Sequence, residues 1–222
     1  MNFYTHQHKH YCGIDLHAKA MYVCILDQTG AKLVHKNLPT TPEAFLRLIA
    51  PYREDLVVAV ECIFTWYWRA DLCAAEGIPF VLGHALSMKA MHGGKAKNAK
   101  IDSQKIAALL RGGMLPQAYV YPAAMRAPRD VLRRRTHLMR NRAALLAHGQ
   151  HTNSQYHLPA IGKKIAAKAN RPGVAERFDD AAVHKTIAVA LALITSYDAL
   201  LTDLELSSLK PAKQHDAQPL YL

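Results

Sequence analysis

The feature that most constrains the fold is a continuous apolar run, DLVVAVEC, at residues 55–62. A strand whose residues do not alternate between apolar and polar needs cover on both faces, as parallel strands between helices do. Three shorter runs, rich in β-branched and aromatic residues, precede it at residues 11–17, 21–27 and 32–38 and predict an antiparallel meander. We therefore expect an α/β fold, a mixed sheet with flanking helices.

The rest of this predicted sheet domain alternates helix and strand. Helical patterns occupy residues 40–53 and 65–77, and a short apolar run at residues 78–84 predicts the fifth strand. Residues 85–100 are rich in Gly and Lys and are expected to form a connection. The helix predicted at residues 102–113 then begins with Asp102, the acid in a strongly basic stretch.

The second half of the chain has the pattern of two long helices. Apolar pairs recur every seven residues between residues 128 and 150, and apolar residues fill two heptad positions between residues 182 and 207. We expect a long helical hairpin or coiled coil, and a homo-oligomer formed through it. The predicted domains are a sheet domain at 1–120, a basic hairpin at 121–210 and a tail at 211–222.

Positive charge is concentrated in the middle of the chain. The formal net charge is +11, and residues 86–178 hold 18 Lys and Arg against three acids, whereas the first 85 residues hold seven against eight. This asymmetry favours a nucleic-acid partner over general solubility. The alternative is an anionic membrane surface, but we expect no apolar run near the roughly 18 residues that a bilayer span needs, and no signal peptide.

The basic side chains expected to contact phosphates lie in the connection, in the helix at 128–150 and in the loop after it. That helix carries almost no acids for intrahelical ion pairs, which favours a phosphate-facing role over a merely solvated face. The candidates are Lys95, Lys97, Lys100, Arg133, Arg134, Arg135, Arg140, Arg142, Lys163 and Lys164.

Two carboxylates fall inside predicted strands. Asp15 lies between Ile14 and Leu16, and Glu61 ends the run VVAVE. A buried carboxylate costs several kcal/mol without a partner, and a salt bridge to an arginine would satisfy one such residue. Two of them on neighbouring strands need a divalent metal. With Asp102 as a third ligand, this is the ribonuclease-H-like nuclease plan, whose oxygen ligands suit Mg²⁺ or Mn²⁺.

At these residues the chain resembles a known family. The resemblance is carried by GIDLHAKAMYVCILD, VVAVECIFTWYW, KNAKIDSQKIAALLRGGMLPQAYVYP and RDVLRRRTHLMRNRAALLAHGQHTNSQYHLP. These segments look like the N-terminal part of the DEDD-type transposases of the insertion-sequence 110 family, in the 1111-type subgroup. The resemblance implies a RuvC-like domain with four metal-binding acids, a coiled-coil insertion, and a C-terminal domain with a nucleophilic serine, expected beyond this chain. It also implies DNA recombination guided by an RNA that the element encodes.

The resemblance places the family's acids on this chain with one gap. The first acid falls on Asp15, the second on Glu61 and the fourth on Asp102, so that these three are the expected catalytic and metal-binding residues. The third acid, three residues before the fourth, falls on Ala99. Loss of one ligand predicts a catalytically impaired chain. Asn98 could lend an amide oxygen, but it lies on a different helical face.

Three functions remain open at this stage. The first is the N-terminal part of an RNA-guided transposase in the bacterial cytoplasm, associated with the nucleoid. The second is a non-catalytic RNA- or DNA-binding module with a degenerate nuclease fold. The third, an actin-like sugar or acetate kinase, needs Gly-rich phosphate loops that GIDLHAKAMYV lacks.

Overall fold

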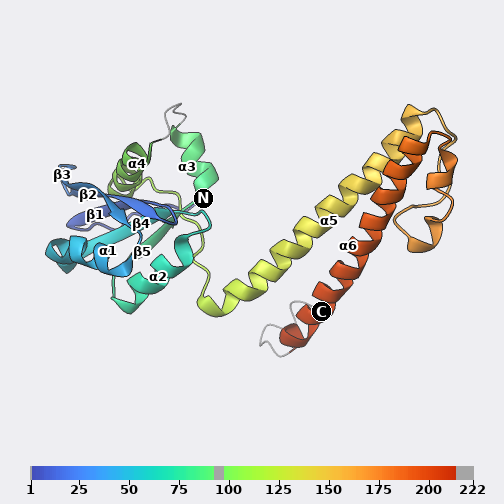
Figure 1. Ribbon diagram of the computed structural model, residues 1–222. Helices are drawn as coiled ribbons and strands as arrows, with labels where there is room; N and C mark the ends of the chain where they lie inside the picture. Colours follow the sequence, from blue (N-terminus) through green and yellow to red (C-terminus); the bar gives the residue numbers. More distant parts are fainter. Residues whose placement is uncertain (1, 93–97, 214–222) are drawn as a thin grey trace. The chain divides into compact units, whose positions relative to one another are not determined.

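A five-stranded mixed sheet forms the centre of the first unit, Met1–Tyr121 (Figure 1). The structure, a computed structural model, describes residues 2–92 and 98–213. The strand order is β3-β2-β1-β4-β5, in which β1 to β3 are antiparallel and β4 and β5 continue parallel to β1. This is the ribonuclease-H-like order, so the predicted fold class is confirmed. The strands are β1 (His10–Leu16), β2 (Ala20–Asp27), β3 (Lys32–Pro39), β4 (Leu56–Glu61) and β5 (Phe80–Gly83).

Both faces of the sheet are covered, as the apolar run of β4 requires. Val58 and Val60 pack in a core with α1 (Pro42–Ile49) and α2 (Trp66–Ala75). Val57 and Ala59 face the opposite way, into a core with α4 (Ala99–Arg111). Figure 1 shows α4 on one side of the sheet and α1 and α2 on the other. A short 3₁₀ helix, η1 (Ala50–Asp55), links α1 to β4.

The region predicted as a connection is partly helical. Residues Ala85–His92 form α3 directly after β5, so the expectation of an irregular segment from residue 85 was wrong for its first half. ALSMKAMH contains no Gly or Pro, and its Ala, Leu, Met and Lys residues are good helix formers. Lys95 and Lys97 lie outside the described residues.

The second unit, Pro122–Leu222, is built on two long helices that pack against each other. They are α5 (Ala123–Gln155) and α6 (Ala181–Lys213), both longer than predicted, and Pro128 lies near the start of α5. Two single-turn 3₁₀ helices, η2 (Lys168–Asn170) and η3 (Ala175–Arg177), shape the loop between them. Val174 and Phe178 of this loop pack in one core cluster with Ile187 of α6.

Helix α6 corrects one expectation from the sequence. Its segment Ala181–Ser207 is long and apolar enough, by length and composition, to cross a membrane, with a mean hydropathy of 1.6 over its most apolar window. The expectation that no apolar run approaches that length was therefore wrong, because Ala, Leu and Val occupy several faces of this helix. In the structure Ile187, Ala190 and Ile194 are buried in the second unit.

An arginine is buried within the first unit. Arg69 on α2 has no exposed surface, and its guanidinium lies 3.9 Å from the ring centre of Phe45 and 4.2 Å from that of Trp68. Its Nη2 donates to the sulfur of Met21, while Nε and Nη1 have no hydrogen-bond partner in the described part of the chain. Burial lowers the pKa of Arg69 to about 10. Aromatic faces therefore take the place of a carboxylate here.

Helix α4 approaches β1 closely because residue 13 is glycine. A Cβ atom added at Gly13 would lie 2.3 Å from the backbone nitrogen of Ala107 and 2.4 Å from the carbonyl oxygen of Ser103. Both of these residues are buried on α4. Since the obstructing atoms belong to the helix backbone, no side-chain movement can relieve the clash, and α4 can dock in this position only on a glycine.

We expect Gly13→Ala to destabilise the first unit by about 1–3 kcal/mol, the usual cost of overpacking. Urea denaturation followed by tryptophan fluorescence measures it, because both tryptophans, Trp66 and Trp68, lie in this unit. Gly112→Ala at the end of α4 is the control in the same unit, since its φ is −76° and its added Cβ comes no closer than 3.2 Å to another atom. An unchanged denaturation midpoint for Gly13→Ala would contradict the close-packing argument.

Candidate functional site

Two of the predicted acids lie at the carboxyl ends of two neighbouring strands, which form one edge of the sheet. Strands β1 and β4 are parallel, and Ile14 is paired with Val60. The next residue on each strand is an acid, Asp15 on β1 and Glu61 on β4, so the two residues stand at adjacent strand positions. Only 12% of the Asp15 side chain is exposed. The sheet topology therefore brings together two acids that are 46 residues apart in the sequence.

The third predicted acid is close enough to affect the first. Asp102 lies in the first turn of α4, the helix that docks on β1 at Gly13. Burial raises the pKa of Asp15 above its ordinary range, the hydrogen bond and charge of His17 oppose this rise, and repulsion from Asp102 adds to it. The two carboxylates thus share one electrostatic environment, as a site for a cation requires.

Two basic side chains contact these acids and were not predicted. His17 Nε2 lies 3.0 Å from Asp15 Oδ2, and Lys105 Nζ lies 3.4 Å from Asp102 Oδ1. Simple spacing could have identified both residues. His17 follows Asp15 by two positions, the spacing that returns to the same face of a strand, and Lys105 follows Asp102 by three positions on a helix.

The resemblance assigns the family's third acid to position 99, which is an alanine in this chain. Ala99 is the first residue of α4, one turn before Asp102, so an acid there would lie on the same side of the helix. Asn98 does not replace it, because its side-chain oxygen accepts a hydrogen bond from the backbone N–H of Lys100 at 3.0 Å. Asn98 therefore serves as the N-cap of α4.

The donor set of this edge fits a hard divalent cation in its chemistry. Carboxylate oxygens are the ligands that Mg²⁺ and Mn²⁺ prefer, and Asp15 and Glu61 supply them from adjacent strands. Within residues 2–92 and 98–213, however, no group of three or more His, Cys, Asp or Glu side chains is arranged to hold a metal. His17 contacts Oδ2 of Asp15 and Lys105 contacts Oδ1 of Asp102, so a cation that binds these oxygens would have to displace both basic side chains.

The predicted phosphate-binding residues divide into two kinds. Arg133, Arg134 and Arg140 on α5 are exposed. By contrast, Arg135 Nε donates to Glu205 at 2.8 Å, and Arg142 forms an ion pair with Asp198. Lys100, Lys163 and Lys164 are exposed. The acids absent from α5 are thus supplied in part by α6.

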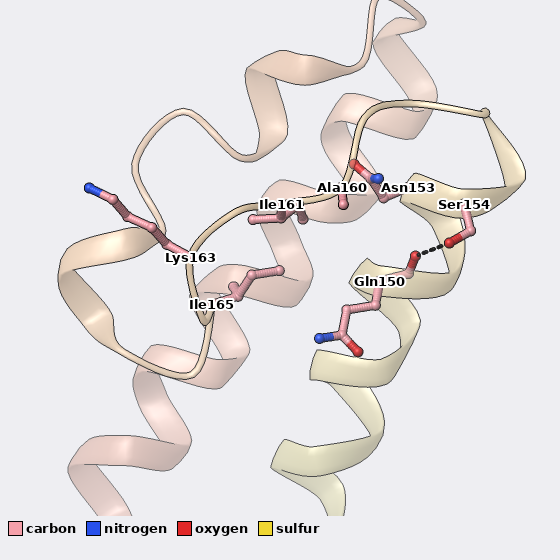
Figure 2. Close-up of a pocket in the computed structure, with 7 residues that line it drawn as sticks. All are labelled: Gln150, Asn153, Ser154, Ala160, Ile161, Lys163 and Ile165. Carbon is pink, nitrogen blue, oxygen red and sulfur yellow. Dashed lines mark hydrogen bonds between the residues drawn. The ribbon is translucent and has the colours of Figure 1, made fainter.

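A small cavity of about 210 Å³ lies at the loop end of the second unit. Figure 2 shows Lys163 extending away from it, and the Ser154 hydroxyl donating to the carbonyl of Gln150. The Asn153 amide nitrogen donates to the carbonyls of Leu158 and Pro159, each at 3.1 Å. Since the Asn153 bonds hold the loop against the end of α5, the cavity is explained by the folding of the loop.

Comparison with known protein families gives one match. Residues 12–158 match the family of DEDD transposases of insertion sequence 110, IS110, described as a transposase. The matched region is more than half of the chain and contains Asp15, Glu61, Asp102 and the whole of α5. A comparison with curated proteins finds no match.

We expect Asp15→Asn to stabilise the metal-free chain at pH 7. The folded chain raises the pKa of Asp15, so the protonated form is favoured on folding and stability is lost as the pH rises through that raised value. The Asn variant escapes this loss. Urea midpoints measured across the pH range should therefore converge towards about pH 3, below the ordinary aspartate pKa of about 3.9, and separate towards pH 7. A difference independent of pH would argue against a desolvated charge as the cause.

Proposed function

Since this chain belongs to the IS110 family of DEDD transposases, which act in DNA transposition, we propose that Asp15, Glu61 and Asp102 form its phosphodiester site. The observation that supports this most is the adjacency of Asp15 and Glu61 on parallel strands, with the charge of Asp102 acting on Asp15. Mg²⁺ or Mn²⁺ is the proposed cofactor. Such an ion, when bound, supplies the positive charge that the attacking and leaving oxygens of a phosphodiester need.

The chain's own residues have distinct tasks in this proposal. Asp15 offers the metal ion a carboxylate oxygen from a rigid central strand, and Glu61 offers a second one from the neighbouring strand. Asp102 comes from α4 and adds negative charge from above the sheet. His17 contacts Oδ2 of Asp15 and must move away before that oxygen can bind a metal ion. Lys105 must likewise leave Oδ1 of Asp102.

We propose further that the chain as written is impaired in catalysis. A methyl group stands at position 99 where the family pattern has an acid, so one ligand of four is lost. Two-metal phosphodiester chemistry depends on the full ligand set and its orientation. The second candidate function is a non-catalytic nucleic-acid-binding module. Ala99 favours it too, since the loss of a metal ligand affects the reaction and leaves the basic surface unchanged.

The proposed nucleic-acid partners are DNA and a guide RNA encoded by the element. Support comes from the 18 basic residues between positions 86 and 178 and from the exposure of Arg133, Arg134 and Arg140. Backbone phosphates dominate such binding and make it dependent on salt. Assignment to the 1111-type subgroup and a location at the bacterial nucleoid follow from the resemblance and stay predictions.

Self-association of the second unit is also proposed. Leu132 and Met139 on α5 and Val189, Leu193 and Leu200 on α6 are between 44% and 56% exposed. Apolar side chains at such regular spacing on long helices are typical of helix–helix interfaces. Sedimentation equilibrium of the purified chain tests this proposal, and a monomer at all concentrations would overturn it.

Titration with Mg²⁺ or Mn²⁺ tests the acidic site. At ten times the dissociation constant, binding should stabilise the chain by about 1.4 kcal/mol and raise its melting temperature. Asp15→Asn should abolish this rise, whereas Ala99→Asp should produce it at a lower metal concentration, because a ligand is restored. Glu43→Gln, an exposed acid on α1, is the control and should respond like the parent. Identical responses of the parent and Asp15→Asn would end the proposal.

Filter binding tests the nucleic-acid surface. Replacing Arg133, Arg134 and Arg140 together with Gln should weaken binding to every sequence and reduce the salt slope by roughly one for each lost phosphate contact. The control replaces Arg135 and Arg142, which are held in ion pairs, and should change the salt slope less. Binding is compared for the element's RNA, random RNA and duplex DNA. Equal loss of all three as salt rises would contradict a role for guide RNA.

A further inference from the structure

An aromatic ring stands almost fully in solvent beside the acidic edge. Phe64 is 85% exposed, the highest value among the large apolar side chains of the described residues. It lies three positions after Glu61, in the turn between β4 and α2. A phenylalanine in water forgoes the stabilisation of burial, so a ring held here suggests a contact made only when a ligand is bound.

The turn that carries Phe64 is held in place at both ends. The backbone N–H of Cys62 donates to the carbonyl of Gly83 at 2.8 Å, which ties the turn to the end of β5. The Thr65 hydroxyl donates to the carbonyl of Leu16 at 2.9 Å, which ties it to the residue directly after Asp15. The backbone on which the ring sits is therefore fixed beside the first acid by hydrogen bonds.

A second exposed apolar side chain lies at the same edge of the sheet. Glu61 is paired with Gly83 in the parallel β4–β5 register, and Leu86 follows Gly83 by three positions, as Phe64 follows Glu61. Leu86 is 75% exposed, in the first turn of α3. The neighbouring ends of β4 and β5 are thus each followed, three residues on, by an exposed apolar side chain.

We propose that Phe64 is a stacking platform for an unpaired nucleobase of the DNA strand whose phosphate lies at Asp15 and Glu61, with Leu86 as a second apolar contact. This inference rests on the proposed function. A flat ring accepts the π-face of any base and is tolerant of sequence. The surroundings favour a nucleic-acid strand, because its anionic phosphate matches a cation held by the acids while its base offers the apolar face that Phe64 needs.

The location also has a consequence for the form of the DNA. A base inside a duplex is already stacked on its neighbours and offers no free face to a protein side chain. A ring adjacent to the reacting phosphate therefore selects a strand that is single or locally opened. The acids would provide the chemistry, and Phe64 would hold the nucleotide beside the bond to be cut.

The test measures affinity for a single-stranded oligonucleotide and for the same sequence as a duplex, in Mg²⁺. Phe64→Ala should weaken single-strand binding about 5- to 150-fold, the range for loss of one stacked base, and leave duplex binding unchanged. Phe64→Trp should retain affinity, and Phe64→Leu should recover only part of it. Tyr119→Ala is the matched control, an aromatic residue that is 67% exposed and lies beside β5.

A second readout locates the contact and separates it from the metal proposal. Light-induced crosslinking of 5-iodouracil in the single strand should attach to Phe64, within the tryptic peptide of residues 54–69. The ratio of parent to Phe64→Ala affinity should persist in the Asp15→Asn background. Equal affinities for Phe64→Ala and Tyr119→Ala, with the melting response to Mg²⁺ intact, would overturn the stacking role and leave the acidic site standing.

Discussion

The close approach of α4 to β1 is the contact on which the candidate site depends. Gly13 lets the helix backbone at Ser103 and Ala107 lie directly against the strand. Two residues further along β1 is Asp15, and one residue before Ser103 is Asp102. The spacing between these carboxylates is thus set by backbone packing of rigid elements. Such placement is more exact than a loop could give.

The same packing creates an electrostatic cost that the fold must carry. Asp15 is buried and is repelled by Asp102, and both effects raise its pKa. The ion pairs with His17 and Lys105 offset only part of this cost, because both basic groups are partly exposed to water. Sites that hold like charges together are typical of functional positions, where stability is given up for binding.

The sequence predicted the sheet well because its signals are local. Unbroken apolar composition identified β4, and turn residues separated β1, β2 and β3. Helix α3 was missed because Gly93 and the lysines that follow dominated the composition of the whole stretch. Among the site residues, the adjacent strand positions of Asp15 and Glu61 followed from the parallel pairing of β1 with β4. The ion pairs of Arg135 and Arg142 could not be foreseen, since their partners lie 70 and 56 residues away, respectively, on α6.

Fold and chemistry are encoded by different residues in this chain, and Ala99 shows the difference. Alanine has the highest helix propensity, so it suits the first turn of α4, and the N-cap at Asn98 does not depend on it. The helix therefore forms without an acid at position 99. Gly13 has no such freedom, because any side chain there meets the backbone of α4. The fold is therefore kept whether or not position 99 carries the proposed fourth ligand.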